Sequence, residues 1–155
     1  MFLTLSLLLS ILESMIPILG GMIPGIKLGL ANIILVVVLY MYGIKEVFAI
    51  ALLRVLLMGI LRTGIFSTTF FFSLFGTICS VSSMALAQKT KLSIIGVSVI
   101  GSIFHSIGQI MIAMLLLHLP NLIYYLPWMI LASVITGTIV GYLSKYMLEQ
   151  VKKAL

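Results

Sequence analysis

The longest apolar run of the chain is Leu92–Leu119, LSIIGVSVIGSIFHSIGQIMIAMLLLHL, which contains no aspartate, glutamate, lysine or arginine. A helix that crosses a lipid bilayer needs about 20 consecutive, mostly apolar residues. This run exceeds that length, and only two histidines and a few small polar residues interrupt it. It therefore predicts a membrane-spanning helix.

Similar apolar runs occur on both sides of Leu92–Leu119. The other apolar runs are Met1–Leu19, Ile26–Gly43, Val47–Leu61, Ile65–Ala87 and Leu122–Met147. With Leu92–Leu119 they make six runs, which use nearly all of the 155 residues. We therefore expect a single transmembrane domain, residues 1–155, built as an integral membrane bundle of six transmembrane helices.

The overall composition agrees with a membrane protein and excludes an ordinary soluble one. Hydrophobic residues make up 63% of the chain and charged residues 8%, the mean hydropathy is +1.36, and aspartate is absent. A soluble domain has roughly 25% charged residues. A membrane β-barrel needs segments of about ten residues that alternate in polarity, whereas Ile33–Leu39 and Met111–Leu117 are continuously apolar. The predicted fold class is therefore all-α.

The positions of the basic residues predict the orientation of the chain. With six spans both termini lie on one side, and most of the lysines fall on that side: Lys45, Lys89, Lys91, Lys145, Lys152 and Lys153. The opposite side receives Lys27 and Arg62. Cytoplasmic loops carry the excess of basic residues, so we expect a multi-pass protein of the cell membrane with both termini in the cytoplasm. No basic surface is interleaved with aromatics, so the bilayer and not nucleic acid is the expected partner.

Three serines in the first run, Ser6, Ser10 and Ser14, are spaced by four and share one helix face. Small residues at this spacing let two membrane helices approach closely. The spacing is compatible with packing inside this chain and with docking onto a partner membrane protein. Further on, small and polar residues form stripes that we expect to face one another: Ser73, Gly76, Thr77, Ser80, Ser83; Ser98, Ser102, His105, Gln109; and Ser133, Gly137, Gly141.

Ionisable residues within the apolar runs are the candidate functional residues, because such groups are costly in a bilayer and usually face the interior of the bundle. The predicted topology gathers seven polar residues in the outer half of the bundle: Glu13, Lys27, Asn32, Arg54, Arg62, His105 and Gln109. Arginine binds carboxylate or phosphate through two hydrogen bonds. We therefore expect a pocket, open to the outside, for a small anionic or amphipathic ligand. A structural Glu13–Arg54 ion pair and a hydrogen-bonded core His105 are the alternatives.

Several kinds of chemistry have no motif in the sequence. There is no Gly-rich phosphate loop ending in Gly-Lys-Ser/Thr, so ATP hydrolysis by that route is excluded. No cluster of cysteine and histidine offers a transition-metal site. The chain also cannot form the paired-aspartate Mg²⁺ clamp of prenyl diphosphate chemistry, because it has no aspartate. We expect no cofactor and no resident metal, and the balance favours a protein without enzymatic activity of its own.

Four segments carry a resemblance to a known family: Pro24–Asn32 (PGIKLGLAN), Leu53–Leu56 (LRVL), Phe72–Gly76 (FSLFG) and His105–Gln109 (HSIGQ). With them the chain resembles, over nearly its full length, the Gx transporter family, also labelled heptaprenyl diphosphate synthase component I. That family is similar to the S components of energy-coupling-factor transporters.

The resemblance implies an S-component-like bundle of six helices that captures a small molecule from outside. It works with a transmembrane coupling subunit and two ATPases. Lys27 and Asn32 would lie at the outer mouth, with Arg54, His105 and Gln109 deeper. In S components the first helix often carries alanines spaced by four for docking, and here serines hold that spacing.

Three functional hypotheses follow. The first is a binding and transport subunit for a small ligand, energised by partners. The second is a membrane accessory subunit of a heptaprenyl diphosphate synthase in menaquinone or isoprenoid biosynthesis, paired with a catalytic prenyltransferase. The third is a scaffold in a membrane quinone or electron-transfer assembly.

Overall fold

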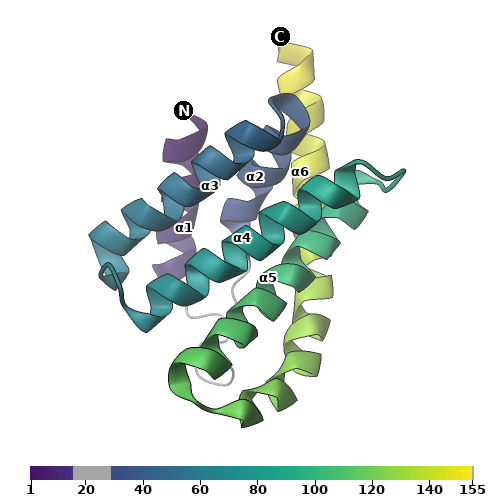
Figure 1. Cartoon of the computed structure of the whole chain (residues 1–155). Helices are drawn as coiled ribbons and strands as arrows, with labels where there is room; N and C mark the ends of the chain where they lie inside the picture. Colours follow the sequence, from purple (N-terminus) through teal and green to yellow (C-terminus); the bar gives the residue numbers. More distant parts are fainter. Residues whose placement is uncertain (16–28, 155) are drawn as a thin grey trace.

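The structure is a computed structural model that describes residues 1–15 and 29–154 (Figure 1). Its α-helices are α1 (Phe2–Met15), α2 (Leu30–Met41), α3 (Ile44–Met58), α4 (Thr68–Gln88), α5 (Ile94–Leu117) and α6 (Leu126–Ala154). A π-helical turn, η1 (Gly59–Thr63), extends α3, and a 3-10 turn, η2 (Pro120–Tyr125), precedes α6. The described residues contain no strand, so the predicted all-α class is confirmed.

Three segments of the described chain are long and apolar enough to cross a membrane: Thr68–Gln88, Ile94–Leu117 and Pro120–Lys153. Two further helices, Phe2–Glu13 and Leu30–Met41, are apolar but shorter. Helices able to span a membrane are therefore present, as expected. The number of six spans stays a prediction.

Three helix starts differ from the starts of the apolar runs because local sequence signals determine them. The fourth run begins at Ile65, but α4 begins after Ser67, whose hydroxyl accepts a hydrogen bond from the Phe70 N–H at 3.1 Å. A serine in this position satisfies one of the free N–H groups of the first turn. Likewise, Ser93 caps α5 by accepting from Gly96 N–H. Leu126 begins α6 after the 3-10 turn, because Pro120 starts a separate short element.

The second half of the chain is held by close helix contacts at glycines. A Cβ on Gly101 would lie 2.5 Å from Met84 Cγ, and one on Gly108 would lie 2.9 Å from Cys79 Sγ, so α5 approaches α4 closely. A Cβ on Gly137 or Gly141 would lie 2.9 or 2.7 Å from a backbone Cα of α5. The expected mutual packing of the small-residue stripes is therefore confirmed for α4, α5 and α6 (Figure 1).

Both termini lie toward the same end of the molecule in Figure 1, which we call the terminal end. The connection between α2 and α3, the connection between α4 and α5, and the last turns of α6 also lie there, and they carry the six exposed lysines expected on one side: Lys45, Lys89, Lys91, Lys145, Lys152 and Lys153. The tightest apolar core fills this half: Ile34, Leu35, Val38, Leu39, Val47, Ala51, Val81, Met84 and Val97.

Candidate functional site: a polar cavity

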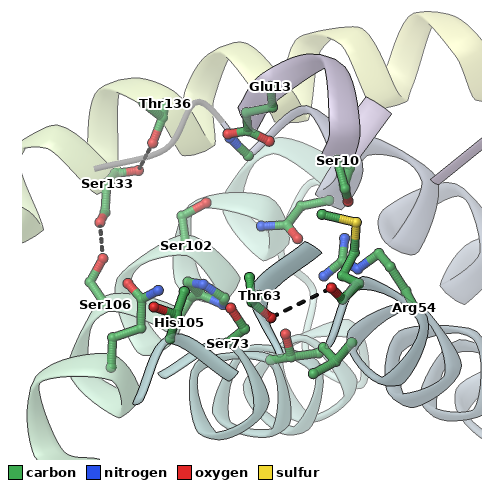
Figure 2. A pocket seen from close by; sticks show the side chains of 18 of the residues that line it. Ser10, Glu13, Arg54, Thr63, Ser73, Ser102, His105, Ser106, Ser133 and Thr136 are labelled. Carbon is green, nitrogen blue, oxygen red and sulfur yellow. Dashed lines mark hydrogen bonds between the residues drawn. The ribbon is translucent and has the colours of Figure 1, made fainter. Parts of the chain in front are cut away.

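The half of the bundle away from the terminal end contains a cavity of about 300 Å³. It is enclosed by the second half of α1, the start of α2, the second half of α3 with η1, the first half of α4, the middle of α5 and the first half of α6. Most of its lining side chains are polar: Ser10, Glu13, Asn32, Arg54, Arg62, Thr63, Thr69, Ser73, Thr77, Ser102, His105, Ser106, Gln109, Ser133 and Thr136. Figure 2 shows these side chains converging on a shared space.

The cavity brings together every candidate site residue that the structure describes. Glu13, Asn32, Arg54, Arg62, His105 and Gln109 come from four helices and η1, and all six line it. Lys27 lies outside the described residues. Those six residues therefore share one cavity, and their role in binding a ligand stays a prediction.

Arg54 reaches the cavity from the face of α3 that is turned inward. Its side chain is only 6% exposed. Within the described residues it makes no hydrogen bond and no ion pair, although Glu13 is near enough for the two charges to interact. The alternative of a direct structural Glu13–Arg54 ion pair is therefore not what this structure shows.

Glu13 instead joins the ends of two helices. One of its carboxylate oxygens accepts a hydrogen bond from the backbone N–H of Gly29. Gly29 precedes α2 and adopts a φ of 74°, a left-handed conformation that glycine takes without strain. The carboxylate thus holds the end of α1 against the start of α2 and contributes a negative charge to the rim of the cavity.

The π-helical turn at Gly59–Thr63 extends the inner face of α3. Met58, Arg62 and Thr63 all line the cavity, and the Thr63 hydroxyl donates to the Met58 carbonyl at 3.5 Å. Gly59 makes this turn possible beside α4, because a Cβ there would lie 2.7 Å from the Phe70 ring. Single π-helical turns are rare and occur frequently at functional sites.

The α5 side of the cavity depends on a glycine in α4. A Cβ on Gly76 would lie 2.8 Å from Gln109 Cγ and 3.0 Å from His105 Cε1, so the absence of a side chain at this position leaves room for both residues. Gln109 is 8% exposed and makes no hydrogen bond within the described residues. The Gln109 amide and the Arg54 guanidinium are thus two large, buried polar groups that make no side-chain hydrogen bond within the described residues.

Two serines on facing helices complete this side. Ser106 Oγ on α5 and Ser133 Oγ on α6 lie 2.6 Å apart, and Ser133 also donates to the Met129 carbonyl at 2.6 Å. A hydroxyl has a single hydrogen. Because Ser133 gives its hydrogen to Met129, Ser106 donates to Ser133, and the remaining lone pairs of both oxygens can accept.

Sequence reasoning missed Ser106, Thr136 and Thr63 as cavity residues. The signal for the first two was present, because Ser106 lies four residues after Ser102 and Thr136 three residues after Ser133, which places each pair on one helix face. Thr63 had no such signal, since it reaches the cavity through the π-helical turn. Ser98, expected in the same stripe, instead donates to the Gly137 carbonyl at 2.9 Å between α5 and α6.

Two serines of α1, for which docking onto a partner is one expectation, lie on the inner side of that helix. Ser6 is 0% exposed, and Ser10 lines the cavity and donates to the Ser6 carbonyl at 2.9 Å. Ser6 is therefore buried in the bundle, and Ser10, which is half-buried, faces the cavity. The side chain of Ser14 lies outside the described part, and docking through these serines stays a prediction. The exposed face of α1 carries Thr4, Leu8 and Leu12 instead. Close approach at Ser6 serves packing within the chain.

No group of three or more histidine, cysteine, aspartate or glutamate side chains that could hold a metal ion occurs among the described residues. The ionisable side chains that line the cavity are Glu13, Arg54, Arg62 and His105.

Comparison with known proteins gives one result at the level of family. No curated protein and no solved structure matches the chain. The profile of the family described as heptaprenyl diphosphate synthase component I matches residues 2–147, which is most of the chain. This agrees with the second label of the family that the sequence motifs resemble. The chain therefore belongs to the heptaprenyl diphosphate synthase component I family.

Proposed function

We propose that this chain is a membrane-embedded binding subunit that holds a small anionic or amphipathic molecule in its polar cavity, while partner proteins supply energy or catalysis. The observation that carries the proposal is Arg54. A guanidinium that is 6% exposed and has no acceptor among the described residues is costly to bury. A carboxylate or phosphate in the cavity would accept two hydrogen bonds from it and remove that cost.

The size of the cavity supports a small ligand. Sites for small molecules occupy about 300–1,000 Å³, and this cavity of about 300 Å³ lies at the lower limit. It can enclose a molecule of the size of a vitamin or an amino acid. A chain of seven isoprene units is much larger.

The charge distribution supports capture from outside the cell. The six exposed lysines occupy the terminal end, and the cavity occupies the opposite half. If the positive-inside rule holds for this chain, the lysines lie in the cytoplasm and the cavity faces the outer leaflet. Import with a coupling subunit and two ATPases is the transport scheme that the S-component resemblance suggests.

The family description favours a second candidate, an accessory subunit of a prenyl diphosphate synthase. Arg54 and Arg62 both line the cavity and would suit a diphosphate. In this case only the headgroup would enter the cavity, and the isoprenoid tail would lie in lipid. The scaffold hypothesis has less support, because a scaffold has no need of a polar cavity.

Native mass spectrometry of the full chain, extracted gently from its membrane, tests the proposal. We expect the unmodified chain to retain an anionic small molecule and Arg54→Gln to lose it. Lys45→Gln is the matched control, because Lys45 is an exposed cation of the same helix at the terminal end. Retention of the same molecule by Arg54→Gln, or failure of that variant to accumulate in the membrane, contradicts the proposal. Co-purification with ATPases or with an Asp-rich prenyltransferase separates the two candidates.

A further inference from the structure

Two chemically different groups of side chains line the cavity from different helices. The arginine end consists of Arg54, Arg62 and Asn32, from α2, α3 and η1. The amide end consists of Gln109, Ser102, Ser106 and Ser133, from α5 and α6. Arg54 lies on one side of the close-up view in Figure 2, and Ser106 and Ser133 lie on the other.

The amide end is built for hydrogen bonding and not for an apolar tail. Gln109 is more than nine-tenths buried and has an unsatisfied carboxamide within the described residues. A buried amide that faces an apolar group loses its hydrogen bonds to water and gains none. The Ser106–Ser133 pair adds oxygens that still accept, because its two hydrogens are directed at Ser133 and Met129. The end therefore offers acceptors for an N–H or O–H, and Gln109 adds a donor.

Hydroxyl groups of α4 also line the cavity. Thr77 of α4 lines the cavity, is buried, and makes no side-chain hydrogen bond within the described residues. Ser73, one turn earlier, lines it as well. A ligand that reached from Arg54 to Gln109 would thus pass over hydroxyl groups.

From this arrangement we infer that the ligand is bifunctional: a small molecule with a carboxylate or phosphate at one end and an uncharged N–H- or O–H-bearing group, such as a carboxamide, at the other. The inference rests on the proposed function and narrows it. It excludes an isoprenoid tail from the amide end, so the hydrocarbon of a prenyl diphosphate would add no binding affinity there.

Matched probes test this inference. Adipamate and 6-methylheptanoate share a carboxylate and a flexible chain, and differ in a terminal carboxamide against an isopropyl group of similar shape. Binding to the full chain in lipid nanodiscs is measured by equilibrium dialysis, with empty nanodiscs to subtract partition into lipid. We expect adipamate to bind at least about tenfold more tightly, because an unpaired buried amide is costly. Geranyl diphosphate is expected to bind no more than about threefold more tightly than inorganic pyrophosphate.

Variants at the amide end test the role of Gln109. Gln109→Met keeps an unbranched side chain, and we expect it to lower adipamate affinity about tenfold while 6-methylheptanoate changes less than about twofold. Gly76→Ala is the second variant, because its Cβ would lie 2.8 Å from Gln109 Cγ and displace the amide. This variant should also reduce the preference for adipamate over 6-methylheptanoate. Ser98→Ala is the control, since this hydroxyl lies on α5 outside the cavity lining.

The inference is overturned if 6-methylheptanoate binds as tightly as adipamate, if geranyl diphosphate binds more than about tenfold tighter than pyrophosphate, or if the preference survives in both Gln109→Met and Gly76→Ala. Arg54→Gln separates this failure from a failure of the proposed function. If binding depends on Arg54 but shows no preference for the carboxamide, only the inference is contradicted. If Arg54→Gln does not change binding, or if no probe binds, both the inference and the proposed function are contradicted.

Discussion

The terminal end and the cavity half of the bundle are built from the same helices, yet side chains fill them differently. On α3, Val47 and Ala51 are buried in the apolar core, and Arg54, three residues after Ala51, lines the cavity. On α4 the order along the chain is reversed, with Thr77 lining the cavity and Val81 in the core. Each helix thus changes its inner face from apolar to polar at about the same depth.

This difference explains why the polar residues of a hydrophobic chain are concentrated in one region and not scattered. The apolar core holds the helices together by close contact, which is the main attraction available to helices in lipid. That attraction allows the other half to carry groups that contribute little to cohesion. The comparison predicts that substitutions in the terminal half change stability, whereas substitutions around the cavity change binding.

The largest expected effect lies at the close contact between α5 and α6. In Gly141→Leu the added Cβ would lie 2.7 Å from the Cα of Ile95, a backbone atom that cannot move without separating the helices. Overpacking of this kind costs about 1–3 kcal/mol or more, so we expect loss of most folded protein, measured as the monodisperse fraction after detergent extraction.

Gly96→Ala is the control for that experiment, because the nearest atom to a Cβ there is 3.6 Å away. This variant should fold at least as well as the unmodified chain, since alanine favours a helix by up to about 1 kcal/mol over glycine. Equal loss of folded protein in both variants would show that close approach at Gly141 does not hold α5 and α6 together.

A labelling experiment tests whether the two halves face opposite sides of the membrane. In a Cys79→Ala background, Asn121→Cys in η2 and Lys91→Cys between α4 and α5 are both at exposed positions. We expect a membrane-impermeant maleimide to label the first in intact cells and the second only after permeabilisation. The reverse result would place the cavity toward the cytoplasm and contradict capture from outside.

Glu13→Gln is expected to raise the affinity for adipamate by about three- to tenfold, because it removes the negative charge that competes with the ligand for Arg54. The amide oxygen can still accept from the Gly29 N–H, so the contact between α1 and α2 is kept. Equilibrium dialysis measures the change. Glu13→Ala, which removes both charge and acceptor, is the comparison, and an unchanged affinity in Glu13→Gln would mean that Glu13 does not act on the ligand.

The smallest expected effects distinguish two neighbouring hydroxyls of α4. Ser80 is 1% exposed, and its hydroxyl has no hydrogen-bond partner in the described part of the chain. Ser80→Ala should leave adipamate binding unchanged and raise the free energy of unfolding by up to about 1 kcal/mol, because a buried unpaired hydroxyl is removed. Thr77→Val should change that free energy by less than about 1 kcal/mol and weaken binding about threefold. Thermal unfolding and dialysis of both variants test whether the boundary between the cavity half and the terminal half lies between Thr77 and Ser80.

The sequence alone was sufficient for much of the site. Glu13, Arg54 and His105 could be found because ionisable residues in apolar runs are rare and point inward. Gln109 followed from its spacing to His105 on one helix face. The start of α4 at Ser67 and the place of Thr63 could not be found in this way, since a cap and a π-helical turn depend on local backbone geometry.

Composition indicated a membrane protein, because 8% charged residues cannot cover a surface in water. The continuously apolar runs indicated an all-α chain with helices able to span a membrane. Periodicity determined which faces of the helices are polar. The tertiary structure was needed to show that Ser6 and Ser10 face inward and that Arg54 and Gln109 share one cavity. It was also needed to show that Glu13 accepts a hydrogen bond from Gly29 and not from Arg54. The physical reason is that a side chain's partner depends on how closely neighbouring helices approach, and that distance is set by glycines and serines on other parts of the chain.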